Sequence, residues 1–126
     1  MNKFKKILLI YIIWLVALFV VAYLGQILVR LRPGFQVEFG GWSNFDGQYY
    51  LTLASKGYYN FHQEFLPIFP YLIRRLTIFG QNYFLTGMLI SHVSIIVALY
   101  LFYKLVEMDF KSSVAQKSVL YLLLFP

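Results

Sequence analysis

The stretch Asn44 to Tyr50, NFDGQYY, places a carboxylate among aromatic side chains in a chain that has only five acidic residues. A carboxylate can act as a general base when it lies within hydrogen-bond reach of the hydroxyl that it deprotonates, and the chemistry requires only one such group. Asp46 is therefore the candidate catalytic residue. From its spacing alone, a capping role is favoured, because the helix dipole stabilises a carboxylate in the first turn of a helix, and both roles are compatible with each other.

Polar and basic side chains follow Asp46 at positions where they could bind a phosphate group through charge-assisted hydrogen bonds. The candidates for phosphate binding are Lys56, His62, Arg74 and Arg75. Gln63 and Glu64, which form a polar triplet with His62, complete the set of candidate substrate-binding residues. The alternative is that the cations form the basic ends of a helix at the membrane surface. A metal site needs at least three protein ligands, and this segment offers one histidine and scattered carboxylates, so we predict no metal site.

Other chemistries have little support in the sequence. No cysteine occurs, which excludes disulfides, thiolate ligands and cysteine nucleophiles from these residues. The glycine-rich loops that bind nucleotides and the nucleophile elbow of hydrolases are also missing, and no cofactor is predicted. His92 lies in an apolar run between Ser91 and Ser94, where it could mark a proton path or, as a neutral side chain, hydrogen-bond to a neighbouring helix.

The composition is that of a membrane protein. Of the 126 residues, 60% are hydrophobic and 21% aromatic, and 13% are charged, against about a quarter in soluble domains. The formal net charge of +6 could suit nucleic acid. However, the basic residues stand at the ends of apolar runs, where they face lipid headgroups and set topology, so no nucleic-acid partner is expected.

Three apolar runs predict the helices that position these residues. Ile7 to Val29 and Tyr83 to Tyr103 are each long enough, at about 1.5 Å per residue, to cross a hydrocarbon core of about 30 Å. A polar turn is expected over Glu107 to Ser113. Val114 to Pro126 is too short to span, so we interpret it as the start of a third transmembrane helix, with an interfacial segment as the alternative. The first run is too long for a signal peptide core, which favours an uncleaved anchor.

Residues 30–82 join the first two spans and hold every candidate site residue. Ser43 and Asp46 fit a capping box for a helix over Tyr49 to Lys56, and Gly57 stands where a left-handed C-terminal cap belongs. Phe65 to Ile73 is a short apolar stretch that contains two prolines and precedes two arginines. This pattern predicts a short helix at the membrane surface, with its arginines at headgroup level.

The orientation follows from the lysines that precede the first span, Lys3, Lys5 and Lys6. A basic cluster at the first helix usually keeps that end in the cytoplasm. We therefore expect a multi-pass protein of the cell membrane, with its N-terminus in the cytoplasm and residues 30–82 on the external side.

Three stretches in order resemble one known family: NFDGQYYLTLASKGYY, FLPIFPYLIRRL and the closing LLLFP. They are similar to the GPI mannosyltransferase II (PIG-V-like) family and its prokaryotic relatives, which belong to the GT-C class of membrane glycosyltransferases. The resemblance covers residues 42–75 and the final Phe125-Pro126. It implies a GT-C-like fold and a polyprenyl- or dolichyl-phosphate sugar as donor.

The resemblance also implies roles for individual residues. Asp46 falls on the catalytic acidic position, Arg74 on the arginine that ends the proline segment, and His62-Gln63 on a pair that precedes that segment. The chain departs from the pattern at Phe45, where a tryptophan is common, and at Glu64. Members of the family also have many more helices than these residues provide.

Together, these features predict an all-α fold of polytopic transmembrane helices, with a partly helical first external loop that carries an interfacial helix. We expect the N-terminal part of a single membrane domain, with spans at 7–29 and 83–103, the external loop at 30–82 and a third helix from 114. The predicted activity is transfer of a sugar, mannose by the resemblance, from a lipid-linked donor to an acceptor hydroxyl. The alternatives are a transporter fragment, which would carry polar residues and broken helices within its spans, and a small accessory membrane protein.

Overall fold

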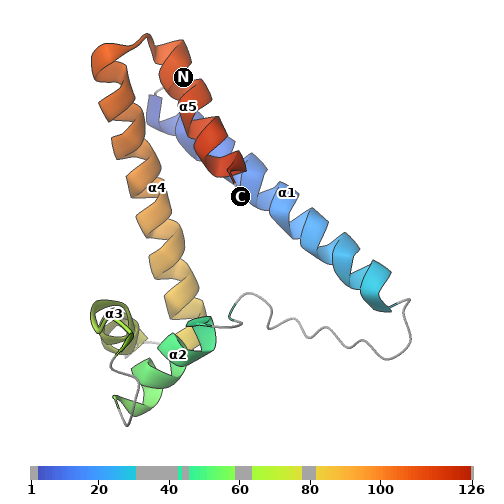
Figure 1. Ribbon diagram of the computed structural model, residues 1–126, viewed down its shortest axis with the longest axis vertical. Coiled ribbons are helices and arrows are strands. Elements are labelled where there is room, and N and C mark those ends of the chain that lie inside the picture. The colour runs from blue at the N-terminus through green and yellow to red at the C-terminus, as the bar shows by residue number, and fades with distance from the viewer. Residues whose placement is uncertain (1–2, 31–42, 44–45, 59–63, 78–81, 126) are drawn as a thin grey trace. The chain divides into compact units, whose positions relative to one another are not determined.

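The computed structural model describes residues 3–30, 43, 46–58, 64–77 and 82–125. These residues form five α-helices and no strand: α1 (Lys3–Arg30), α2 (Asp46–Lys56), α3 (Ile68–Leu76), α4 (Tyr83–Asp109) and α5 (Ser112–Leu124) (Figure 1). The prediction of an all-α fold is confirmed for this part of the chain. The candidate residues His62 and Gln63 lie outside the described residues.

Helices α1 and α4 are the two long apolar helices that the sequence predicts. They contain 28 and 27 residues, and both are long and apolar enough to cross a membrane. The predicted polar turn over Glu107 to Ser113 is wrong in extent, because α4 continues to Asp109 and the Phe110 amide still donates to the Val106 carbonyl at 3.0 Å. Glu107 and Met108 are good helix formers, so they prolong the helix.

The chain divides into two compact units. Unit 1 combines Met1–Gln36 with Val93–Pro126, and unit 2 is Val37–His92. Unit 1 therefore holds α1, the C-terminal part of α4 and α5, whereas unit 2 holds α2, α3 and the first turns of α4. The single membrane domain expected from the sequence remains a prediction.

Unit 1 is built around a small core to which three helices contribute. In Figure 1, α5 returns alongside the N-terminal part of α1, and the two helices are in contact. Apolar side chains at helical spacing point inward from each element because each helix offers one face to the others. The buried members are Ile7, Tyr11, Leu99, Tyr103, Ala115, Val119 and Leu123.

A polar cluster around Glu107 closes one end of unit 1. The Glu107 carboxylate accepts hydrogen bonds from Lys3 Nζ at 2.7 Å and from the Tyr103 hydroxyl at 3.0 Å, and Lys104 Nζ lies 3.5 Å from its second oxygen. The Tyr103 hydroxyl also lies 2.7 Å from Ser112 Oγ. The Glu107 cluster thus connects α1, α4 and α5 through one carboxylate and one phenol.

Tyr103→Phe is expected to lower the free energy of unfolding by about 1 kcal/mol, because the hydroxyl of this side chain, which is 1% exposed, links Glu107 and Ser112. Thermal unfolding in detergent measures the change. Tyr121→Phe is the matched control, since Tyr121 belongs to the same unit and is 68% exposed. Equal melting temperatures for the two variants would contradict a stabilising role of the cluster.

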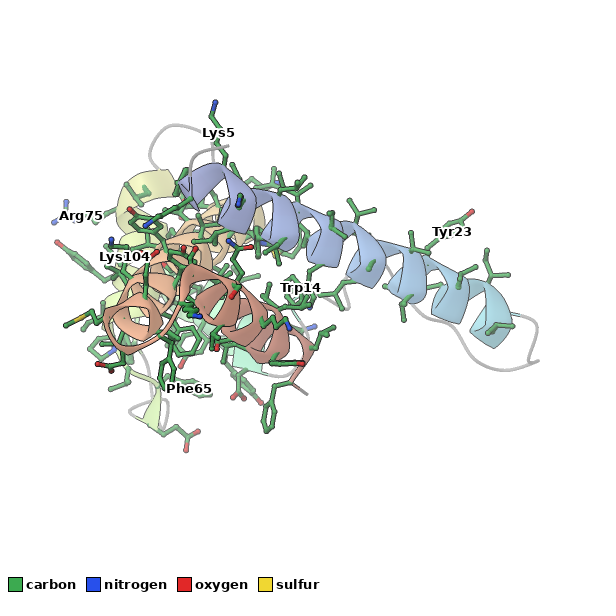
Figure 2. All side chains as sticks on the ribbon, turned by 90° about the horizontal axis from the view of Figure 1, so that it is seen from above. Lys5, Trp14, Tyr23, Phe65, Arg75 and Lys104 are labelled. Atoms are coloured by element: carbon green, nitrogen blue, oxygen red, sulfur yellow. The ribbon has the colours of Figure 1, made fainter. Side chains whose placement is uncertain are left out.

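The C-terminal half of α1 presents large apolar side chains on its surface. Tyr23 is 59% exposed and projects outward from the helix (Figure 2), and Val21, Leu24 and Leu28 are also exposed. Contiguous apolar surface of this extent marks contact with a membrane or another protein. Helix α1 is long enough to cross a membrane, so the hydrocarbon core of a bilayer is an environment that fits this apolar surface.

Candidate functional site

Asp46 opens helix α2 and is exposed there. The helix begins three residues before the predicted Tyr49, because an acidic first residue is favoured by the helix dipole. The predicted capping box with Ser43 depends on residues outside the described part and stays a prediction. The predicted end is confirmed: Gly57 has φ 85° and its amide donates to the Leu53 carbonyl at 2.9 Å.

Helix α3 is displaced from the stretch that the sequence predicted, Phe65 to Ile73. It covers Ile68–Leu76, with Pro67 at its N-terminal cap and Pro70 in its first turn, where a missing amide hydrogen costs nothing. Both arginines lie within the last turn rather than beyond it, because arginine is a good helix former and a cation favours the C-terminal end of a helix.

Aromatic contacts hold α3 and the turn before it against α2. The ring of Phe65 stacks on Tyr49 at 5.2 Å and meets Tyr50 edge-on at 5.2 Å, and Phe69 meets Tyr50 edge-on at 5.3 Å. The Tyr58 hydroxyl also donates to the Phe65 carbonyl at 2.8 Å. The YY pair of the NFDGQYY stretch therefore sets where α3 lies.

The two adjacent arginines have different surroundings. Arg74 Nη1 lies 3.6 Å from the position that a Cβ atom on Gly57 would occupy, so its guanidinium sits at the C-terminal end of α2, where Lys56 is the last residue. Arg75 donates through Nε to the Tyr71 hydroxyl at 3.1 Å, and its guanidinium lies 5.3 Å from the centre of that ring. Its side chain projects outward from α3 (Figure 2). Arg74 is therefore the arginine whose guanidinium lies near the C-terminal end of α2.

Asp46 and these cations lie at opposite ends of α2. The helix has 11 residues, so at about 1.5 Å per residue its two ends are about 16 Å apart. Glu64, the remaining described candidate, is exposed in the turn that precedes α3. No group of side chains that could hold a metal occurs among the described residues. The arrangement is thus an acid and a basic pair separated by the length of a short helix.

An apolar cavity of about 160 Å³ lies inside unit 2, between α2, α3 and the first turns of α4. Its wall reaches the acidic end of α2, because Gly47 follows Asp46 directly. A Cβ atom on Gly87 would lie 3.3 Å from Ile73 Cδ1, so this glycine allows α4 to approach α3 closely. The lining residues are Ser43, Gly47, Leu51, Phe69, Ile73, Phe84, Gly87, Met88 and Ser91.

No protein family model, no curated protein and no solved structure matches this chain. The likeness to membrane mannosyltransferases therefore rests on the three stretches of sequence described above.

Sequence reasoning did not find the apolar cavity. Its glycines are the available signal: Gly47 interrupts the start of a helix and Gly87 interrupts an apolar run, and an isolated glycine in a helix often marks a close approach of another element. His92, which the sequence singled out, does not line the cavity although Ser91 does. The structure thus adds an apolar cavity whose lining includes none of the candidate site residues.

Proposed function

We propose that this chain is the N-terminal part of a polytopic, GT-C-like membrane glycosyltransferase. It transfers a sugar, mannose by the family resemblance, from a polyprenyl-phosphate carrier to an acceptor hydroxyl on the external face. One observation carries the proposal: an exposed carboxylate and a pair of cations stand at the two ends of α2, which aromatic contacts hold against α3.

The chemistry of such a transfer uses both ends of α2. Asp46 takes the proton of the acceptor hydroxyl while the hydroxyl oxygen forms a bond to the anomeric carbon of the sugar. At the same time, the bond between that carbon and the phosphate oxygen breaks. The electron pair leaves with the lipid phosphate, whose charge Arg74 and Lys56 stabilise. The donor is already activated by its phosphate, so a single base is sufficient.

Two features favour a membrane enzyme over a transporter fragment. Helices α1 and α4 are continuous over their whole length, whereas a transporter would be expected to break its spanning helices near the substrate. The outer face of α3 exposes Ile68, Tyr71 and Leu76 beside Arg75. An apolar face bordered by arginine suits a helix that lies in the membrane interface, where a lipid-borne donor would arrive.

The topology that we propose predicts which cysteine variants react in intact cells. Because the chain has no cysteine, Ser55→Cys in α2 and Ser113→Cys in α5, both at exposed positions, each introduce a single thiol. A membrane-impermeant maleimide should label Ser55→Cys in intact cells and Ser113→Cys only after lysis. The opposite labelling pattern would show that residues 30–82 face the cytoplasm.

The activity itself is tested with purified full-length protein and radiolabelled polyprenyl-phosphate mannose. We expect transfer to an acceptor in the presence of EDTA, because Arg74 and Lys56 can neutralise a monophosphate without a metal. GDP-mannose without a lipid carrier is the control and should give no product. Transfer from GDP-mannose alone would overturn the proposed donor, and activity lost in EDTA and restored by Mn²⁺ would show that a metal takes part.

A further inference from the structure

Helix α3 has two different faces. Pro70 and Ile73 form its inner face and are buried where α3 packs against α2 inside unit 2. The outer face carries Ile68, Leu72 and Leu76, which follow one another at helical spacing and have exposed fractions of 71%, 39% and 54%. A row of large apolar side chains on a surface marks contact with a membrane or with another molecule.

One cation belongs to the outer face of α3. Arg75 follows Leu72 by one turn of the helix and Ile68 by two turns, so it lies on the same side as both. Its Nε donates to the Tyr71 hydroxyl at 3.1 Å, and its guanidinium lies 5.3 Å from the centre of the Tyr71 ring. This bond orients the planar guanidinium without using its two terminal nitrogens, which are the donors that point outward (Figure 2).

The start of α4 gives the depth of α3 in a membrane. Helix α4 has 27 residues and is about 40 Å long, whereas the hydrocarbon core of a bilayer is about 30 Å thick and the headgroup layers extend it to about 40–45 Å. When α4 spans a bilayer, Gly87 lies about 6 Å from its first residue, near the boundary of the hydrocarbon core. Because Gly87 lies beside Ile73 on the inner face of α3, helix α3 lies at the level of the headgroups.

We propose that the outer face of α3 binds the surface of a bilayer that contains anionic phospholipids. Arg75 contacts the lipid phosphate groups, and Ile68, Leu72 and Leu76 enter the boundary of the hydrocarbon core. The proposal adds a class of lipid to the interfacial position of α3, and it does not depend on the proposed sugar transfer.

An anionic bilayer supplies the two environments that this face needs. Apolar side chains are stabilised by leaving water, and a guanidinium is stabilised by a phosphate group with which it forms parallel hydrogen bonds. In phosphatidylcholine the choline cation offsets the phosphate charge, whereas phosphatidylglycerol keeps a net negative charge. The attraction of one basic side chain to an anionic membrane surface corresponds to about a fivefold preference for the anionic lipid.

The test measures which lipids surround α3 in bilayer nanodiscs made of equal parts of phosphatidylcholine and phosphatidylglycerol. Because the chain has no cysteine, Ile68→Cys introduces one thiol on the outer face of α3 for a bimane fluorophore. Bromine atoms on the acyl chains of one lipid or of the other quench the bimane only when that lipid is in contact with it. Both brominated lipids should quench, and phosphatidylglycerol should be enriched about fivefold over phosphatidylcholine at the label.

The adjacent arginines provide matched variants in the same labelled protein. Arg75→Gln should bring the ratio of the two lipids close to one, whereas Arg75→Lys should keep the preference because it keeps the charge. Arg74→Gln should lower the ratio by less than about twofold, because the Arg74 guanidinium lies near the end of α2 instead. Circular dichroism checks that the variants keep their helices.

Several results would overturn the proposal. Absence of quenching by either lipid would show that the outer face lies in water or is covered by protein, and equal quenching would show that it does not select anionic lipids. An equal loss in Arg74→Gln and Arg75→Gln would show that the attraction is not specific to Arg75. Loss of the preference in inorganic phosphate, but not in sodium chloride of the same ionic strength, would show a site for free phosphate.

The lipid measurement is independent of the transfer assay, because it needs neither a sugar donor nor an acceptor. A preference for phosphatidylglycerol in a protein that transfers no sugar would support the lipid surface and reject the proposed function. Sugar transfer by a protein without this preference would support the function and reject the lipid surface.

Discussion

Asp46→Asn is expected to abolish sugar transfer while leaving the protein folded and inserted in the membrane. Asparagine keeps the size of the side chain and an oxygen that accepts hydrogen bonds, but it cannot take a proton from the acceptor hydroxyl. Loss of a positioned general base typically costs about 10²- to 10⁴-fold in rate. The measurement is initial rate with polyprenyl-phosphate mannose, together with circular dichroism and membrane yield.

The controls separate catalysis from helix capping. Asp46→Ala removes both the base and any hydrogen-bond acceptor, so it should lose the same activity but also some stability at the start of α2. Asp109→Asn changes an exposed carboxylate at the end of α4, far along the chain from the proposed site, and should keep full activity. An active Asp46→Asn enzyme would end the general-base proposal and leave Asp46 with a structural role only.

Arg74→Gln is expected to reduce transfer by about 10- to 100-fold, the range that corresponds to loss of one charge-assisted hydrogen bond. The loss should fall mainly on kcat, because negative charge builds up on the phosphate as the lipid leaves and the guanidinium stabilises that charge. Steady-state kinetics with the lipid-phosphate donor measures the division between kcat and KM.

The adjacent arginine provides the comparison. Arg75 is already engaged with the hydroxyl and the ring of Tyr71, so Arg75→Gln should change kcat by less than about threefold while it weakens the end of α3 slightly. A larger loss in Arg75→Gln than in Arg74→Gln would show that the phosphate binds at α3 and not at the end of α2.

The features that the sequence predicts correctly are those with local signatures. The long apolar runs of α1 and α4 and the left-handed cap at Gly57 follow from a few neighbouring residues. The displacement of α3 also has a local cause, because prolines fit the cap and first turn of a helix better than its middle. This rule, applied to Pro67 and Pro70, would have placed the helix correctly.

Other features depend on contacts between distant residues and could not be predicted in this way. The cavity exists because residues of three helices, among them Gly47, Ile73 and Gly87, line one space. In the same way, charge and helix propensity do not distinguish Arg74 from Arg75, and only the family resemblance pointed to Arg74. In the structure they differ because the Arg74 guanidinium lies near the end of α2 and Arg75 donates to the Tyr71 hydroxyl. The extension of α4 through Glu107 is stabilised by a lysine near the other end of the chain.

The bond between Lys3 and Glu107 joins residues 104 positions apart. At a synthesis rate of about 5 to 20 residues per second, roughly 5 to 20 s separate the translation of the two partners. During that interval the Lys3 ammonium has no Glu107 carboxylate to pair with, and in the topology that we propose it acts as a signal that keeps the N-terminus in the cytoplasm. In that topology, the same side chain first contributes to the orientation of the first helix and, once α4 has formed, ties that helix to the later ones.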